Sequence, residues 1–461
     1  MKILALIIAL NFAPAVMAQQ VAVPQTQAQI QLSFAPLVKQ VAPAVVNIYA
    51  RIMAEPERTP LQRDPFFGRL FGDPEALRPK VQNSLGSGVI LSGDGIVVSN
   101  YHVVGMATDI RVVLSDRREY SAKVLLADDL SDLAILQIED APGDLPSLPL
   151  RASDGVEVGE LALAIGNPFG VGQTVSSGIV SGLARSGADA GTGRGYFIQT
   201  DAPINPGNSG GALVDMQGRL IGVNTSILTR SGGSNGIGFA IPADLVAAFV
   251  AQARDGETRF GRPWAGMTGQ PLDADMAAAF GLDRPGGIIV SGLHAESPFA
   301  RAGFAVGDVI TAVNGQPVNT PSEMVYRMSV TGLGKTAQIT RLRDGAASDV
   351  GVPLMAAPEE PPRAILQMNN RTLFPGLTLS RVNPGVIAEF NLPLDAAGVL
   401  VLDPGALAGR IGLRSGDVIT TVNGVTVDDP RRVAQAFDGR IRAFGLTVLR
   451  GARQITLQFR V

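Results

Sequence analysis

The chain has 461 residues, 46% of them hydrophobic, which is enough material for two to four domains with cores of their own. Its net charge of −3 and pI near 5.6 argue against nucleic acid or an anionic membrane surface as a partner. The absence of cysteine excludes disulfides and thiol chemistry, and the two histidines are far apart, so we expect no metal site and no cofactor.

Residues 1–18 have the pattern of a secretory signal peptide. Lys2 gives the positive start, an apolar core runs from Ile3 to Leu10, and Val16-Met17-Ala18 suits signal peptidase. The apolar run is too short to span a bilayer, although an uncleaved N-terminal anchor is an open alternative. The sequence thus predicts an exported, soluble mature protein that begins with a flexible, Gln-rich segment over residues 19–33.

The first expected strand includes Val45-Val46-Asn47-Ile48, and residues 51–84 then break the strand pattern. This segment holds five prolines and a Phe-rich motif, Asp64 to Gly72. A loop of this length in a compact domain is usually functional or disordered. Its phenylalanines would be costly to leave in water, so we expect them to pack on the same domain or on another surface.

Short alternating apolar runs, separated by Gly and Asp turns, predict two small β-barrels over residues 85–138 and 148–241. An Ala-rich segment with apolar residues at helical spacing, Ala243 to Arg254, predicts a closing helix. Together these elements define a first domain over residues 34–255.

A glycine-rich stretch in the second barrel, Ile204 to Leu213, surrounds one serine, Ser209. A serine nucleophile needs an exposed hydroxyl and neighbouring backbone N–H groups that stabilise the oxyanion formed on the substrate carbonyl. Gly207 can adopt a conformation closed to other residues, which lets its N–H point the same way as that of Ser209. The alternative is an ordinary Gly-Ser hairpin, since the chain contains 54 glycines.

A serine triad also needs a histidine base and a carboxylate. His102 lies at the end of one apolar strand of the first barrel, and Asp132 lies at the start of another. Considered separately, His102 is most simply a surface residue, Asp132 a turn residue and Ser209 a loop residue. The order His, Asp, Ser, with each residue beside its own strand, is that of the chymotrypsin-type double barrel. The sequence therefore predicts a mainly β fold whose first barrel supplies His102 and Asp132 and whose second supplies Ser209.

Two related segments follow, Ala302 to Gly315 and Ile411 to Gly424, and both contain Gly-Asp-x-Ile-x-x-x-Asn-Gly. This pattern is typical of PDZ domains, which bind a peptide C-terminus as an added strand of a sheet. We predict PDZ domains over residues 262–355 and 364–461, joined by a proline-rich linker over residues 356–363.

Further motifs connect these parts to a known family. They are Gly166-Asn167-Pro168-Phe169-Gly170 with Gln173-Thr174-Val175 and Ser177-Gly178-Ile179-Val180-Ser181, then Phe197-Ile198-Gln199-Thr200-Asp201, and Gly238-Phe239-Ala240-Ile241-Pro242. From about Phe34 to its C-terminus, the chain resembles the HtrA (Deg, Do-like) serine proteases, in which a trypsin-like domain precedes PDZ domains. The resemblance implies a periplasmic protein that assembles as a homo-trimer or a multiple of trimers.

The family's site residues can be carried over to this sequence. The resemblance implies a triad of His102, Asp132 and Ser209 and an oxyanion hole formed by the backbone of Gly207 and Ser209. It also implies a regulatory loop over residues 51–84 that can reach another subunit, and a sensor loop over residues 185–196. The pocket for the substrate residue before the scissile bond would be lined by Ile204, Asn224, Thr225, Ser226 and Ile227.

None of the pocket segments contains Asp or Glu, so we expect small or medium aliphatic residues there. Tyr101 stands where the family usually has Asn, and Pro203 where it has a small residue, and both bear on fine specificity. In the first PDZ copy the resemblance implies a carboxylate-binding loop at Ala265-Gly266-Met267, where the family has Leu-Gly-Ile. For the second copy we suggest Pro375-Gly376-Leu377 as the carboxylate-binding loop. We interpret His294, in the first copy, as a surface residue.

The sequence thus predicts an ATP-independent serine endopeptidase that degrades unfolded or misfolded exported proteins, with PDZ domains that bind peptide C-termini. The alternative is a chaperone or scaffold that binds unfolded proteins while its protease site stays latent. Both interpretations require binding to unfolded chains, and only the first requires Ser209. A purely structural envelope protein would explain neither the nucleophile loop nor the PDZ copies.

Overall fold

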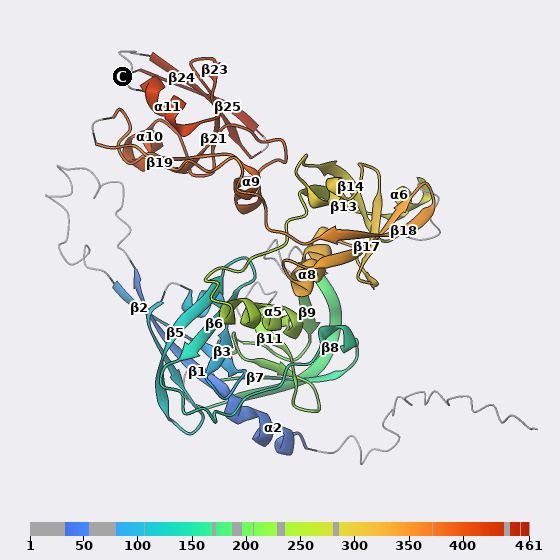
Figure 1. Ribbon diagram of the computed structural model, residues 1–461. Helices are drawn as coiled ribbons and strands as arrows, with labels where there is room; N and C mark the ends of the chain where they lie inside the picture. The colour runs from blue at the N-terminus through green and yellow to red at the C-terminus, as the bar shows by residue number, and fades with distance from the viewer. Residues whose placement is uncertain are drawn as a thin grey trace, which may run out of the picture.

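The computed structural model describes residues 33–54, 80–105, 107–167, 172–186, 196–205, 207–227, 236–279, 285–370, 372–437, 443–451 and 453–460. The predicted signal peptide, nearly all of the segment 19–33 and residues 55–79 lie outside this part of the chain. The architecture is mainly β, as predicted: a pair of closed barrels is followed by two separate sheets, each covered by short helices (Figure 1).

The first barrel contains six strands in the order β1-β2-β3-β6-β5-β4. It is preceded by helix α2 (Ala35–Val41) and the 3-10 turn η1 (Ala42–Ala44). Its elements are β1 (Val45–Ala54), β2 (Lys80–Ile90), β3 (Ile96–Ser99), the one-turn helix α4 (Tyr101–Val104), β4 (Ala107–Val113), β5 (Glu119–Asp128) and β6 (Leu133–Ile138).

The predicted loop over residues 51–84 is shorter than expected. Residues 51–54 of β1 pair with residues 80–83 of β2, so the two strands extend as an antiparallel ribbon beyond the barrel wall. The prediction was wrong at both ends because antiparallel pairing with a neighbour compensates for a weak local strand pattern. The Phe-rich motif lies outside the described residues.

The second barrel also contains six strands, in the order β10-β11-β12-β9-β8-β7. Its elements are the 3-10 turn η2 (Ser153–Gly155), β7 (Leu161–Gly166), β8 (Thr174–Ser186), β9 (Tyr196–Thr200), β10 (Ala212–Val214), β11 (Leu220–Ile227) and β12 (Gly238–Pro242). Residues 187–195 of the predicted sensor loop lie outside the described part of the chain.

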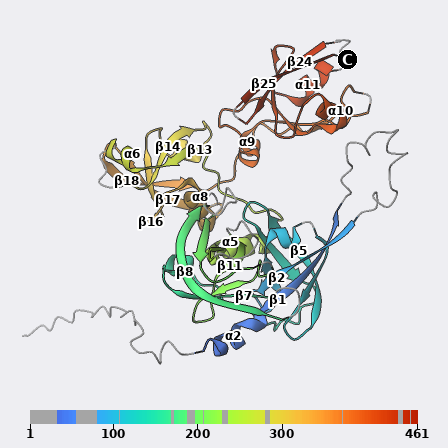
Figure 2. The ribbon, with the colours of Figure 1, turned by 180° about the vertical axis from the view of Figure 1, so that it is seen from behind.

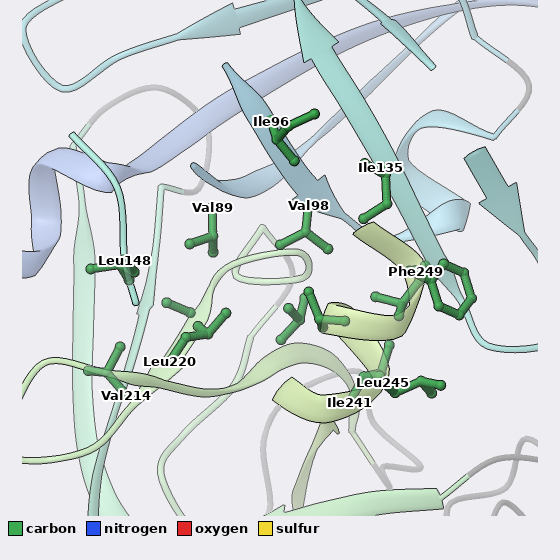
Figure 3. Packing of buried hydrophobic residues seen from close by; sticks show 14 of the residues in the cluster. Val89, Ile96, Val98, Ile135, Leu148, Val214, Leu220, Ile241, Leu245 and Phe249 are labelled. Atoms are coloured by element: carbon green, nitrogen blue, oxygen red, sulfur yellow. The ribbon is translucent and has the colours of Figure 1, made fainter. Parts of the chain in front are cut away.

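Helix α5 (Ala243–Arg254) has the predicted bounds and joins the two barrels. It contacts β5 and β6 of the first barrel and β11 and β12 of the second. Leu245, Val246 and Phe249 lie on its buried face and belong to one hydrophobic core with residues of both barrels, such as Val98 and Val214 (Figure 3). Burying a side chain of this kind contributes about 1.5–3 kcal/mol. This shared core fixes the two barrels relative to each other.

The two C-terminal sheets repeat one plan, as the internal duplication predicts. The first has the order β13-β14-β15-β17-β18, with β16 paired to β15, and the second has β19-β20-β21-β22-β24-β25, with β23 paired to β22. The first copy contains β13 (Met267–Pro271), α6 (Ala274–Ala279), β14 (Ile288–Leu293), α7 (Pro298–Arg301), β15 (Val309–Val313), β16 (Gln316–Pro317), α8 (Pro321–Thr331), β17 (Thr336–Arg343) and β18 (Ala346–Pro353). The second contains β19 (Leu366–Gln367), β20 (Thr378–Arg381), α9 (Pro384–Phe390), β21 (Val399–Asp403), α10 (Gly405–Arg410), β22 (Val418–Val422), β23 (Val425–Thr426), α11 (Pro430–Phe437), β24 (Ala443–Arg450) and β25 (Arg453–Arg460).

The repeated Gly-Asp motif has the same structural role in both copies. Asp308 and Asp417 are buried, and each accepts a backbone hydrogen bond within its own turn, from the N–H of Ala305 and of Arg414. Each also pairs with an arginine of a later strand: Arg343 Nη2 lies 2.7 Å from Asp308 Oδ2, and Arg450 Nη2 lies 2.7 Å from Asp417 Oδ2. A buried carboxylate of this kind needs such partners.

The first PDZ copy packs against the barrels through helix α8, which contacts α5, β8 and β9 (Figure 2). Tyr326 of α8 stacks on Tyr196 of β9 with ring centroids 3.9 Å apart, and Arg327 forms an ion pair with Asp154. The predicted linker over residues 356–363 contains no helix or strand. Across the described residues, none of the helices has the length and apolar character needed to cross a membrane.

Candidate active site

His102 and Asp132 are brought together within the first barrel. β3 ends at Ser99, and the chain turns into helix α4, which carries His102, while Asp132 lies just before β6. His102 Nδ1 lies 2.8 Å and 2.9 Å from the two carboxylate oxygens of Asp132, and the His102 backbone N–H donates to the same carboxylate at 3.1 Å. This contact leaves the other ring nitrogen, Nε2, available for proton transfer.

Asp132 is held in an uncommon backbone conformation, with φ of 52°. Asp and Asn adopt this left-handed conformation more readily than most residues. The fully buried Asn100 donates from Nδ2 to the Asp132 carbonyl oxygen at 2.8 Å. Thr225 of β11 in the second barrel donates its hydroxyl to Asp132 Oδ2. The carboxylate is therefore oriented from both barrels before any substrate is bound.

Ser209 lies across the barrel interface and is partly buried. Its hydroxyl donates to the Thr225 carbonyl oxygen at 3.0 Å, and within the described residues it makes no hydrogen bond to His102. The structure thus brings the three predicted residues to one place, with the serine turned toward β11. A rotation about χ1 moves a serine hydroxyl between staggered positions at little cost.

The backbone around Ser209 leaves two donors free. The N–H groups of Asn208, Gly210 and Gly211 donate to the carbonyl oxygens of Asn205, Asn224 and Asn208. Within the described part of the chain, the N–H groups of Gly207 and Ser209 donate to no acceptor. Gly207 has φ of 97°, a conformation that favours glycine. These two free donors suit an oxyanion.

The predicted specificity-pocket residues have unequal surroundings. Ile204 is 1% exposed and packs in the core of the second barrel. Asn224 is fully buried and donates to the Ala212 carbonyl oxygen, while the Thr225 hydroxyl is committed to Asp132. Ser226 and Ile227 belong to β11, and the structure does not describe their side chains. The lining of the pocket stays a prediction.

Comparisons with known proteins follow the same division of the chain. A trypsin-like peptidase domain model matches residues 86–223, and PDZ domain models match residues 266–354 and 398–442. The periplasmic pH-dependent serine endoprotease DegQ of Escherichia coli is 37% identical over 431 residues, which cover 93% of this chain and 91% of DegQ. The chain belongs to the HtrA family of serine proteases.

Other relatives agree with this assignment. A probable periplasmic serine protease do/HhoA-like of Haemophilus influenzae is 38% identical over 439 residues, covering 91% of this chain and 90% of the relative. The solved structure of the HtrA-type protease AlgW with decapeptide matches with a TM-score of 0.52 at 40% identity, over 71% of this chain and 99% of AlgW. The protein is a serine endopeptidase with a trypsin-like domain and two PDZ domains.

In the first PDZ copy of this HtrA protease, β13 is an edge strand of its sheet, and within the described residues only β14 pairs with it. The predicted carboxylate loop, Ala265-Gly266-Met267, leads directly into β13. Gly266 has φ of 58°, and a Cβ there would lie 2.8 Å from the Trp264 ring, so glycine is required. The Gly266 N–H donates to no acceptor among the described residues. His294 is half-buried rather than a simple surface residue, because its ring packs edge-on against Trp264.

The second PDZ copy differs at the corresponding place. β19 pairs antiparallel with β20, on the side opposite β21. Within the suggested loop Pro375-Gly376-Leu377, the Gly376 N–H donates to the Met368 carbonyl oxygen at 2.9 Å and the Leu377 N–H donates to the Phe374 carbonyl oxygen. The strand edge that a peptide would join is therefore covered by the protein's own chain.

Sequence reasoning missed several residues that hold the site. Asn100 orients Asp132 and was not predicted, and Thr225, which was predicted only as a pocket residue, orients Asp132 through its hydroxyl. Arg262, which precedes β13 of the first PDZ copy, pairs with Asp128 and donates to Ser131 Oγ at 2.6 Å, in the turn that leads to Asp132. These partners come from distant parts of the sequence, and only the barrel topology reveals them.

Proposed function

We propose that this HtrA protease is an exported, ATP-independent enzyme that degrades unfolded or misfolded polypeptides in the periplasm. The observation that carries the proposal is the meeting of an oriented His102–Asp132 pair, the Ser209 hydroxyl and two free backbone N–H groups at the barrel interface. The relatives that are named periplasmic support the location.

In the proposed mechanism, the Ser209 hydroxyl leaves the Thr225 carbonyl oxygen and turns toward His102 Nε2. The hydroxyl oxygen then attacks the peptide carbonyl carbon while its proton passes to His102. The N–H groups of Gly207 and Ser209 bind the oxyanion that forms. Asp132 stabilises the imidazolium, which next gives its proton to the leaving amine. A water molecule then attacks the carbonyl carbon of the acyl group on Ser209 while its proton passes to His102. His102 returns the proton to the Ser209 oxygen, and the acyl group leaves as a carboxylic acid.

We also propose that the first PDZ copy binds the C-terminus of a substrate or activating peptide along β13. Its open edge, the free Gly266 N–H and the peptide named in the AlgW structure support this role. The resemblance to the family supports assembly as a trimer or a multiple of trimers. Light scattering of the purified protein would test the assembly, and a mass of one chain would contradict it.

The proposed activity is tested by cleavage of unfolded casein with the purified mature protein, with and without a hydrophobic C-terminal peptide. We expect cleavage that disappears in Ser209→Ala. If neither protein cleaves casein but both suppress its aggregation, the chaperone alternative is correct. The names of the relatives, which are proteases, favour cleavage.

A further inference from the structure

We infer that Ser87 of the first barrel is a positioning residue for the oxyanion hole in the second barrel. The inference rests on the proposed function, because it concerns the same two N–H groups. Ser87 lies on β2 and is fully buried. It lies in neither the predicted triad nor the predicted pocket.

Ser87 contacts both sides of the nucleophile through its backbone and its side chain. Its hydroxyl donates to the Gly207 carbonyl oxygen at 2.6 Å, and its N–H donates to the Ser209 carbonyl oxygen at 2.9 Å. The same hydroxyl oxygen accepts the Asn167 N–H at 2.8 Å, from the end of β7. One residue of the first barrel thus bonds to three backbone groups of the second.

These bonds determine which donors of the nucleophile loop stay free. In the peptide group between Gly207 and Asn208, the oxygen is held by Ser87 and the N–H by the Asn205 carbonyl oxygen. In the peptide group between Ser209 and Gly210, the oxygen is again held by Ser87 and the N–H by the Asn224 carbonyl oxygen. Between two peptide groups that are fixed at both ends, the Ser209 N–H has little freedom to turn away from the oxyanion position.

The approach of Ser87 to the loop is also very close. Gly210 has φ of 82°, and a Cβ built there would lie 2.1 Å from the Ser87 carbonyl oxygen. The contact therefore demands glycine at position 210. Loss of the Ser87 hydroxyl would release the Gly207 carbonyl oxygen and the Asn167 N–H together, while the close backbone contact would remain.

Ser99 provides a matched control for the removal of a buried hydroxyl. It is also fully buried, and its hydroxyl donates to the Ser87 carbonyl oxygen at 2.8 Å. Among the described residues, the Ser99 hydroxyl makes no hydrogen bond to the nucleophile loop. Ser87→Ala and Ser99→Ala each remove one buried hydroxyl from the same part of the barrel, and only the first removes a bond to the peptide group that follows Gly207.

The test measures kcat and KM for a peptide substrate, together with inhibition by a peptide boronate that mimics the tetrahedral intermediate. For Ser87→Ala we expect kcat to fall about 10- to 100-fold and boronate inhibition to weaken by a similar factor, with KM changed less than about 3-fold. Ser99→Ala should keep kcat within about 3-fold of the wild type. Circular dichroism and thermal unfolding establish that each variant is folded.

Equal losses of kcat in the two variants, or an unchanged kcat in Ser87→Ala, would overturn the inference. If Ser87→Ala does not fold, Ser87→Cys fills the site with a slightly larger side chain that is a weaker donor, and an unchanged kcat in that variant would equally overturn the inference. A wild type without any cleavage would instead contradict the proposed function itself, so the two failures are distinguishable.

Discussion

The catalytic residues of the two barrels differ in whether they already make the hydrogen bonds that catalysis requires. In the first barrel, His102 and Asp132 are already in contact at 2.8 Å, and Asn100 holds the backbone of Asp132. In the second barrel, the Ser209 hydroxyl is bonded to the Thr225 carbonyl oxygen instead of His102. The acid–base half of the site is thus assembled in advance, while the nucleophile must still turn toward it.

Thr225 is the residue that links the two halves. Its hydroxyl donates to Asp132, and its carbonyl oxygen accepts from Ser209. The difference between the barrels teaches that contacts to side chains fix the base, whereas hydrogen bonds to backbone groups, one of them from the Ser87 hydroxyl, fix the surroundings of the nucleophile.

The largest effect is expected from removal of the nucleophile. Ser209→Ala should reduce kcat/KM for a peptide substrate by at least about 10⁴-fold, because alanine has no hydroxyl oxygen to attack the peptide carbonyl carbon. Thermal unfolding should change little, since the lost hydrogen bond is a single one. Residual cleavage close to the wild-type rate would mean that another residue is the nucleophile.

Asp132→Asn tests the contribution of the His102–Asp132 pair, because the substitution removes the charge and keeps the shape of the side chain. The amide is neutral, so it stabilises the imidazolium less, and its NH2 group can donate to His102 Nδ1 and favour the wrong tautomer, so kcat should fall by about 10⁴-fold. The measurement is kcat at neutral pH, with labelling of Ser209 by an organophosphonate as a second measure of its reactivity. A loss below about 10-fold would show that His102 works without this partner.

Thr225→Val removes the hydroxyl that reaches Asp132 and keeps the carbonyl oxygen that accepts from Ser209. A hydrogen bond to a charged group is worth enough that kcat should fall roughly 10- to 100-fold. Thr200→Val is the control, because Thr200 is also buried in the second barrel and its hydroxyl donates to the Ile179 carbonyl oxygen instead. Similar losses in both variants would contradict a specific effect on Asp132.

Arg262→Met tests whether the segment before β13 supports the His102–Asp132 pair. Asp128 and Ser131 would lose the contacts with Arg262, while Asn100 and Thr225 would still hold Asp132, so kcat should fall only about 3- to 10-fold. Arg254→Met is the control, because Arg254 pairs with Asp94 at the surface of the first barrel. Peptide cleavage at wild-type rates in Arg262→Met would mean that the ion pair between Arg262 and Asp128 only attaches the PDZ copy to the first barrel and does not support catalysis.

The smallest effect on catalysis is expected outside both barrels, at Asp308 of the first PDZ copy. Burial raises the pKa of this carboxyl, but the hydrogen bonds from Arg343 and the Ala305 N–H outweigh burial, and the net pKa is below the usual value. Because the folded state has the lower pKa, the carboxylate stabilises the fold above the pKa of the unfolded chain. This stabilisation is lost as pH falls through the lower pKa of the folded state.

Asp308→Asn should therefore lower the urea midpoint of this domain at pH 7 and flatten its dependence on pH below about 4. Cleavage of a short peptide by the barrels should stay at the wild-type rate. A variant whose urea midpoint has the wild-type pH dependence would contradict the role of this carboxylate.

Much of this architecture could be predicted because it depends on local patterns. The order of His102, Asp132 and Ser209 beside apolar strands indicated the double barrel, and the repeated Asn-Gly turns indicated the two PDZ copies. In those turns Asn314 and Asn423 both have φ of 51°, which Asn tolerates, and each is followed by a glycine with positive φ. Such preferences are readable from a few adjacent residues.

The rest depends on contacts between distant segments. The ribbon of β1 and β2, the Thr225 hydroxyl on Asp132, and β19 on β20 all require knowledge of which strands become neighbours. The position of Ser209 in the sequence also gave no sign that its hydroxyl donates to the Thr225 carbonyl oxygen of β11. Side-chain rotation leaves no trace in sequence spacing, so the state of the nucleophile became visible only in the structure.

The central claim is that Ser209 becomes the nucleophile when His102 accepts its proton. The most direct measurement is mass spectrometry of the protein after reaction with a peptidyl organophosphonate. The account predicts one adduct, on Ser209, formed at a rate that drops sharply in His102→Ala. An adduct on another residue, or equally fast labelling of Ser209 without His102, would contradict it.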